Sequence, residues 1–236
     1  MSNILTIAKR QFKSYFNGPV AYIVICLVML ALGFFFWKTF FLIGRVSGRE
    51  MFRWLGLILV FAIPALTMGL LAEEKRTGTI ELLITMPVTE AQVVIGKFLG
   101  VFGLYAVLLL LTVPYPISIS TLGDLDWGPV VSGYLGLLLQ GGAILAIGLM
   151  ASSWTSNQLI ALFIALTLSA FFWIIDKFLP LLPSSLAPVL EWLSFDAHFQ
   201  SMSRGVIDLR DVVYFLSVIV FSLAVGFRAL ESRRWT

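Results

Sequence analysis

The chain has 236 residues, of which 59% are hydrophobic and only 12% are charged, about half the charged share usual in soluble domains. The net charge of +3 does not indicate a nucleic-acid surface, and a single histidine and a single cysteine exclude a multi-histidine metal site and a disulfide framework. The apolar residues form runs of about 20, long enough to cross the roughly 30 Å hydrocarbon layer of a bilayer. The sequence therefore predicts an all-α integral membrane protein.

The first predicted element is an amphipathic interfacial helix over residues 2–17. Its apolar side carries Ile4, Leu5, Ala8, Phe12 and Phe16, and its other side carries Lys9, Arg10 and Lys13. We expect this helix to lie in the headgroup layer with its basic side toward anionic lipid, and the alternative is a solvated extension of the first span. The segment does not have the pattern of a cleavable signal peptide.

Six apolar segments are predicted to span the membrane. One of them is rich in glycine, so we expect it to pack inside the bundle rather than against lipid. The predicted spans cover residues 20–43, 51–72, 93–113, 130–151, 159–179 and 210–230, and the glycine-rich span is the fourth.

The segment before the last span, residues 181–207, has too much apolar surface for water but is too short to cross the membrane. We expect it to form a re-entrant helical hairpin on the outer side, packed on protein because its polar backbone groups must not meet lipid. Its only histidine, His198, is expected to make a hydrogen bond near the outer surface rather than to act in catalysis.

The basic residues predict the orientation. With six spans, both termini lie on one side of the membrane, together with the turn between the second and third spans. The basic residues on that side slightly outnumber those on the other, which places both termini and this turn in the cytoplasm. The cytoplasmic side would carry Lys9, Arg10, Lys13, Lys75, Arg76, Lys97, Arg228, Arg233 and Arg234.

That turn, residues 73–100, is the only densely charged run between two long apolar segments. It opens with two acidic and two basic residues and continues into a short predicted surface helix over residues 77–86, which Pro87 ends. Thr89 and Gln92 have the spacing of a capping box at the start of the third span. Such a short helix, held along the membrane surface by two spans, gives a partner in the cytoplasm something to push on.

Catalytic and energy-converting signals are missing from the sequence. Gly96-Lys97 lacks both the upstream glycine and the following hydroxyl of a phosphate-binding loop, and no nucleophile elbow is present. Charges well inside the spans are almost missing, which argues against an ion-driven carrier. We therefore expect a non-catalytic chain that binds no cofactor and is driven by another protein.

The residues of this turn resemble the signature of type-2 ATP-binding-cassette (ABC-2) transporter permeases. The resemblance comprises the charged cluster, a Gly-Thr-Ile-Glu-Leu-Leu core, the proline and the Gly-Lys-Phe-Leu-Gly entry into the third span. These elements are Glu73 to Arg76, Gly78 to Leu83, Pro87, and Gly96 to Gly100. The sequence Arg204 to Asp208 is further similar to the gliding-motility-associated subgroup of these permeases.

The resemblance implies a subunit of the bacterial cytoplasmic membrane that works with a second permease subunit, as a homodimer or heterodimer, and with a cytoplasmic ABC ATPase dimer that holds ATP and Mg²⁺. The surface helix 77–86 would be the coupling helix that fits into the ATPase. The coupling residues would be Glu73, Glu74, Arg76, Gly78, Thr79, Glu81, Leu82, Leu83 and Pro87.

In this family the second and fifth spans line a pathway for substrate between two permease copies, and an apolar pathway implies an amphipathic or lipid-linked substrate. The candidate lining residues are Phe61, Met68, Phe163, Phe171 and Phe172, for which core or lipid-facing packing is an equal alternative. Three other functions stay open: a gliding-motility-like complex that moves a periplasmic membrane partner without transport, an ion-driven carrier, and an integral membrane enzyme.

Overall fold

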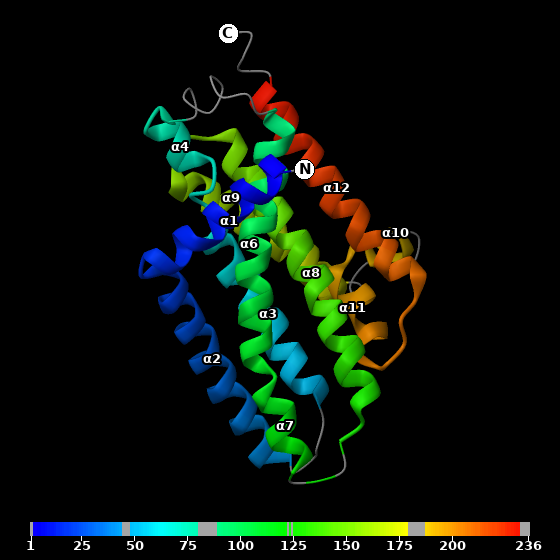
Figure 1. Ribbon diagram of the computed structural model, residues 1–236. Helices are drawn as coiled ribbons and strands as arrows, with labels where there is room; N and C mark the ends of the chain where they lie inside the picture. The colour runs from blue at the N-terminus through cyan, green and yellow to red at the C-terminus, as the bar shows by residue number, and fades with distance from the viewer. Residues whose placement is uncertain are drawn as a thin grey trace.

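The computed structural model describes residues 2–43, 48–79, 89–121, 123, 125–178 and 187–231. In these residues every regular element is a helix (Figure 1). The helices are α1 (Ser2–Asn17), α2 (Val20–Ile43), α3 (Gly48–Thr67), α4 (Ala72–Arg76), α6 (Glu90–Thr112), α7 (Pro114–Ser120), α8 (Trp127–Trp154), α9 (Gln158–Phe178), α10 (Ala187–Leu193), α11 (Phe195–Ser203) and α12 (Leu209–Glu231).

Six helical segments of the described chain are long and apolar enough to cross a membrane, which confirms the predicted all-α, six-span architecture. They are α2, α3 with α4, α6 with α7, α8, α9 and α12. The second span differs from the expectation of one helix up to residue 72, because α3 ends at Thr67 and a turn separates it from α4. Figure 1 places α4, α1 and the end of α12 at one end of the bundle, and α7 and the start of α8 at the other.

Helix α8 is the centre of the bundle, as its glycines predicted, with 83% of its spanning window buried. It packs against α3, α6, α9, α11 and α12. Its glycines admit large neighbours: a Cβ atom on Gly141 would lie 2.2 Å from the ring of Tyr105, whose hydroxyl donates to the Leu137 carbonyl. Small residues on α8 therefore let α6 approach closely enough for a buried side chain to bond to the α8 backbone.

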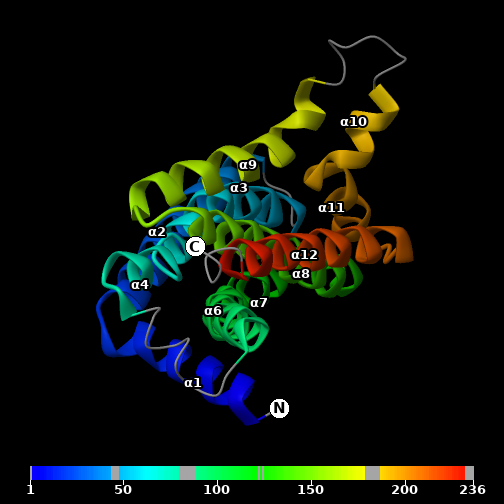
Figure 2. The same cartoon turned by 90° about the horizontal axis from the view of Figure 1, so that it is seen from above.

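Helix α1 packs across α6, which Figure 2 shows nearly end-on. A Cβ atom on Gly100 would lie 2.6 Å from the Gln11 Cβ atom, so the small residues of the Gly-x-x-x-Gly sequence make room for α1. The Tyr15 hydroxyl donates to the Leu66 carbonyl at 2.7 Å and so ties α1 to the end of α3. Burial raises the pKa of Tyr15, which keeps this hydroxyl a hydrogen-bond donor.

The short helices α10 and α11 precede α12 and lie on the side of the bundle away from α1 (Figure 2). Ser194 caps α11, because its hydroxyl accepts a hydrogen bond from the Ala197 amide at 3.3 Å. Residues 181–186 of the predicted hairpin lie outside the described residues. That the hairpin dips into the outer membrane face stays a prediction.

Candidate functional site

The break between α3 and α4 leaves backbone groups that a single serine satisfies. The Ser152 hydroxyl, from the end of α8, accepts hydrogen bonds from the amides of Leu71 and Ala72 at 3.0 Å each. It also donates to the carbonyl of Met68 at 3.0 Å. Because Ser152 is fully buried, these backbone groups lose their partner if the hydroxyl is removed. The geometry of the break thus depends on α8.

A buried ion pair joins α4 to α6. The Lys97 ammonium lies 2.7 Å from the Glu74 Oε1 atom. It also donates a hydrogen bond to the carbonyl of Leu70, which lies in the turn two residues before α4 begins. The Lys97 side chain is 5% exposed and the Glu74 side chain 28% exposed. A charge with so little solvent access is stable only with a partner. The register of the two helices is therefore set by charge as well as by packing.

Two further contacts join α4 to α8 and α9. The Lys75 ammonium donates to the Ser153 carbonyl, and the Gln158 side-chain amide donates to the Glu73 Oε2 atom. The other oxygen of Glu73 pairs with Arg76 at 2.6 Å. We call the set Glu73, Glu74, Lys75, Lys97, Ser152 and Gln158, with the backbone they bind, the α4 junction. Through it, a displacement of α4 acts directly on α6, α8 and α9.

The chain leaves the α4 junction through a tight turn. Thr77 is the C-cap residue of α4. Its hydroxyl forms a hydrogen bond of 3.0 Å with the hydroxyl of Thr79, in which either group can be the donor. Between them Gly78 has a φ of 70°, a left-handed conformation that glycine adopts without strain. The chain is described again from Thr89, where the predicted capping box is present: the Gln92 amide bonds the Thr89 hydroxyl at 3.3 Å, and the Thr89 amide bonds the Gln92 side chain at 3.2 Å.

The structure describes five of the nine predicted coupling residues. Of these, Glu74 turns inward to Lys97, whereas Arg76, Gly78 and Thr79 are exposed. Glu73 is partly exposed and is shared between Arg76 and Gln158. The remaining coupling residues, Glu81, Leu82, Leu83 and Pro87, and most of the predicted coupling helix lie outside the described residues. Their role stays a prediction.

The five candidate pathway residues do not share one environment. Phe61 on α3 and Phe163 and Phe171 on α9 are exposed on the surface of the chain. Met68 is partly buried next to the α4 junction, where its carbonyl accepts from Ser152. Phe172 stacks on Phe195 of α11, with ring centroids 5.0 Å apart, and therefore packs toward the hairpin. The exposed aromatics on α3 and α9 are the ones available to line a path between two copies.

His198 makes two hydrogen bonds, as the sequence led us to expect. Its Nδ1 atom lies 2.7 Å from Asp211 of α12, and its Nε2 atom lies 2.9 Å from the carbonyl of Trp192 in α10. Ser201 donates to the second oxygen of Asp211, not to the imidazole. A serine nucleophile needs the histidine as its base, so this trio joins α10, α11 and α12 rather than forming a hydrolytic triad.

Sequence reasoning missed the residues that receive α4. From the sequence alone, Ser152 to Gln158 is interpreted as a short polar turn. Lys97 is interpreted only as part of the family pattern and as one of the basic residues that predict the cytoplasmic side. A lysine seven residues into an apolar helix is the one available signal, because an ammonium at that depth requires a partner. Nothing in the sequence indicates that the partner is Glu74.

Comparison with known proteins gives one family. The family model described as "ABC-2 family transporter protein" matches residues 50–227, from the third residue of α3 to most of α12. Among curated proteins none matches the chain. The matched region contains the whole α4 junction.

Proposed function

Since the chain belongs to the ABC-2 transporter family and is a multi-pass permease subunit of an ABC transporter, we propose that it pairs with a second permease subunit and couples to a cytoplasmic ATPase dimer through residues 73–87. ATP and Mg²⁺ bind to the partner ATPase, and hydrolysis of this ATP drives the transport cycle. Both termini and α4 face the cytoplasm of a bacterium in this proposal. In this proposal the chain supplies no catalytic group, and its helices move in response to the conformational change of the ATPase.

The observation that carries the proposal is the α4 junction. Polar side chains from three different helices hold this short charged helix at the end of the bundle. Here Lys97 of α6, Ser152 of α8 and Gln158 of α9 all hold it, at the point where the chain enters the predicted coupling helix. Movement imposed on the segment after Arg76 therefore reaches the spans through direct polar contacts.

The exposed apolar surface supports an amphipathic or lipid-linked substrate. The exposed side chains available to line a pathway between two copies have no hydrogen-bonding groups. They are Phe61, Phe163 and Phe171. The ion-driven alternative has little support, because the charged side chains buried in the described residues are Lys97 and Asp211, and each is engaged in a structural contact. A vesicle assay that compares ATP with an ion gradient separates the two mechanisms.

The experiment that tests the coupling role is co-purification with a cytoplasmic ABC ATPase expressed together with this chain. We expect Glu81→Arg to abolish ATPase association or its stimulation, while the variant still elutes as a folded protein in detergent. The matched control is Glu50→Arg, which reverses a charge at the start of α3, the opposite end of the same span, and should leave both readouts unchanged. Retention of association and stimulation by Glu81→Arg would remove the coupling assignment.

A further inference from the structure

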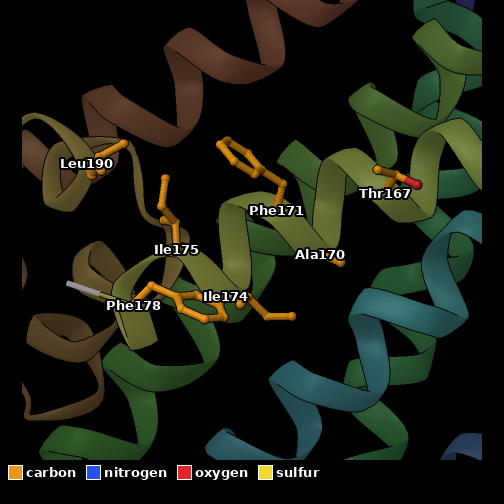
Figure 3. Close-up of a pocket in the computed structure, with 7 residues that line it drawn as sticks. All are labelled: Thr167, Ala170, Phe171, Ile174, Ile175, Phe178 and Leu190. Carbon is orange, nitrogen blue, oxygen red and sulfur yellow. The ribbon is translucent and has the colours of Figure 1, made fainter. Parts of the chain in front are cut away.

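An apolar groove opens beside the last turns of α9. It encloses about 400 Å³ and is lined by Thr167, Ala170, Phe171, Ile174, Ile175 and Phe178 of α9 and by Leu190 of α10. Figure 3 shows Phe171 and Ile175 on the side of α9 that faces Leu190. Its volume lies within the usual range of ligand pockets, roughly 300–1,000 Å³. Because its lining is nearly all apolar, the groove fits a hydrocarbon chain.

A polar cavity of about 310 Å³ lies next to the groove. The two share the contact between α9 and α10: Ile175 and Leu190 line the groove, and the residues that follow them, Asp176 and Glu191, line the cavity. Arg204 of the turn after α11 lines the same cavity. A ligand that occupies both would meet hydrocarbon at one end and charges of both signs at the other.

One acceptor in this cavity is left without a partner. The Oδ2 atom of Asp176 pairs with Lys177 at 2.9 Å, and the carboxyl group lies near that of Asp196, so its buried Oδ1 atom has no hydrogen-bond donor within the described chain. A buried carboxylate oxygen is costly unless a donor reaches it, so the site favours a ligand that brings N–H groups. The guanidinium of Arg204 is exposed and suits a phosphate, to which it can donate two parallel bonds.

We propose that groove and cavity together bind one phospholipid whose headgroup carries a primary ammonium and a phosphate. Its acyl chain fills the groove, its ammonium donates to Asp176 and Glu191, and its phosphate accepts from Arg204. Charge complementarity decides for this occupant. Three carboxylates (Asp176, Glu191 and Asp196) lie beside two cations (Lys177 and Arg204), and this acidic excess favours a headgroup that carries an ammonium and disfavours an anionic one.

The walls of the site are held in place before any ligand arrives. Lys177 at the end of α9 pairs with Asp196 of α11 at 2.5 Å, which fixes the hairpin to the span. His198 holds the end of α10 to α12 through the Trp192 carbonyl and Asp211. A preformed site loses less conformational entropy on binding. The inference rests on the proposed function, since it names the class of amphipathic molecule that meets α9 at Phe171.

The test is photolabelling of the purified full chain in nanodiscs that contain phospholipids with a diazirine on the acyl chain. Three headgroups are compared: ethanolamine, choline and glycerol. We expect ethanolamine lipid to label α9 and α10 peptides at least fivefold more than glycerol lipid, with choline lipid between them because its quaternary ammonium has no N–H donor. Ile174→Trp should block labelling, and the matched control Ile160→Trp, on exposed α9 surface outside the groove, should not.

A second variant keeps the test valid if Ile174→Trp does not fold. Glu191→Gln changes only an exposed side chain and should reduce the ethanolamine preference about threefold without reducing labelling by glycerol lipid. Equal labelling by all three lipids, or labelling that survives both variants, overturns the proposal. Because labelling requires no ATPase, its failure leaves the Glu81→Arg result untouched, and loss of ATPase coupling leaves the labelling untouched.

Discussion

The buried pair of Glu74 and Lys97 gives the most direct test of the α4 junction, because its two members differ in solvent access. Glu74→Ala strands the Lys97 ammonium, which is 5% exposed, and removing one partner of a buried pair costs about 3–5 kcal/mol. Lys97→Met leaves a carboxylate that is 28% exposed and can turn toward water, and its main cost is the loss of the donor to the Leu70 carbonyl, about 1–3 kcal/mol. We expect the glutamate variant to be the less stable of the two.

The double variant completes the cycle. With both charges removed, only the loss at the Leu70 carbonyl remains, so the double variant should be about as stable as Lys97→Met, and the two single effects should fail to add by about 3 kcal/mol or more. The measurement is unfolding in mixed micelles of dodecyl maltoside and sodium dodecyl sulfate, read as the shift of the transition midpoint. Glu50→Ala, which breaks a solvent-exposed contact of 3.8 Å with Arg53, serves as the control and should shift it little.

Additive single effects would refute the reasoning, because they would mean that Glu74 and Lys97 do not interact in the folded chain. Equal effects of the two single variants would refute the argument from unequal burial. The same variants can be assayed for ATPase stimulation, and a folded double variant that no longer stimulates the partner would assign the pair a role in transmission beyond stability.

Two further predictions concern the neighbours of this pair. Ser152→Ala should destabilise the chain by about 2–6 kcal/mol, because two buried amides lose their acceptor at about 1–3 kcal/mol each, whereas Ser153→Ala, whose hydroxyl bonds only within its own helix, should change the same unfolding midpoint little. Gly100→Ala should displace α1 and expose it to limited proteolysis, since its new Cβ atom would lie 2.6 Å from α1, whereas Gly56→Ala, with no neighbour within 4 Å, should leave the cleavage pattern unchanged. Resistance of the Gly100 variant to the protease would contradict the packing of α1 on α6.

The sequence was sufficient for the features that depend on local pattern. Long apolar runs define the six spans, and the Thr89–Gln92 box marks the start of α6, because capping involves residues only three apart. The glycines of α8 correctly indicated a buried helix. In each case the physical cause lies within the helix itself.

The candidate site could not be predicted in the same way, because its contacts join distant segments. The break after Thr67 depends on the hydroxyl of Ser152, which lies 80 residues from Ala72 in the sequence. Pro64 and Gly69 indicate a disturbed helix here, but they do not indicate which residue satisfies the freed backbone groups. The Gly-x-x-x-Gly spacing of α6 permits close approach of another helix, but the spacing does not say which one, and in the structure the helix at these glycines is α1. Small residues indicate close packing without identifying the partner.

The two ends of α9 connect the coupling segment with the proposed lipid site. Gln158 at its start bonds Glu73 of the α4 junction, and Lys177 near its end pairs with Asp196 of the hairpin. Only 22% of its spanning window is buried, against 83% for α8, so α9 has far less packing to resist displacement. Its 21 residues form a rod about 30 Å long, the thickness of the hydrocarbon layer. If the proposed coupling holds, a displacement of α4 would be carried to the groove at Phe171 by one stiff helix that polar contacts hold at both ends.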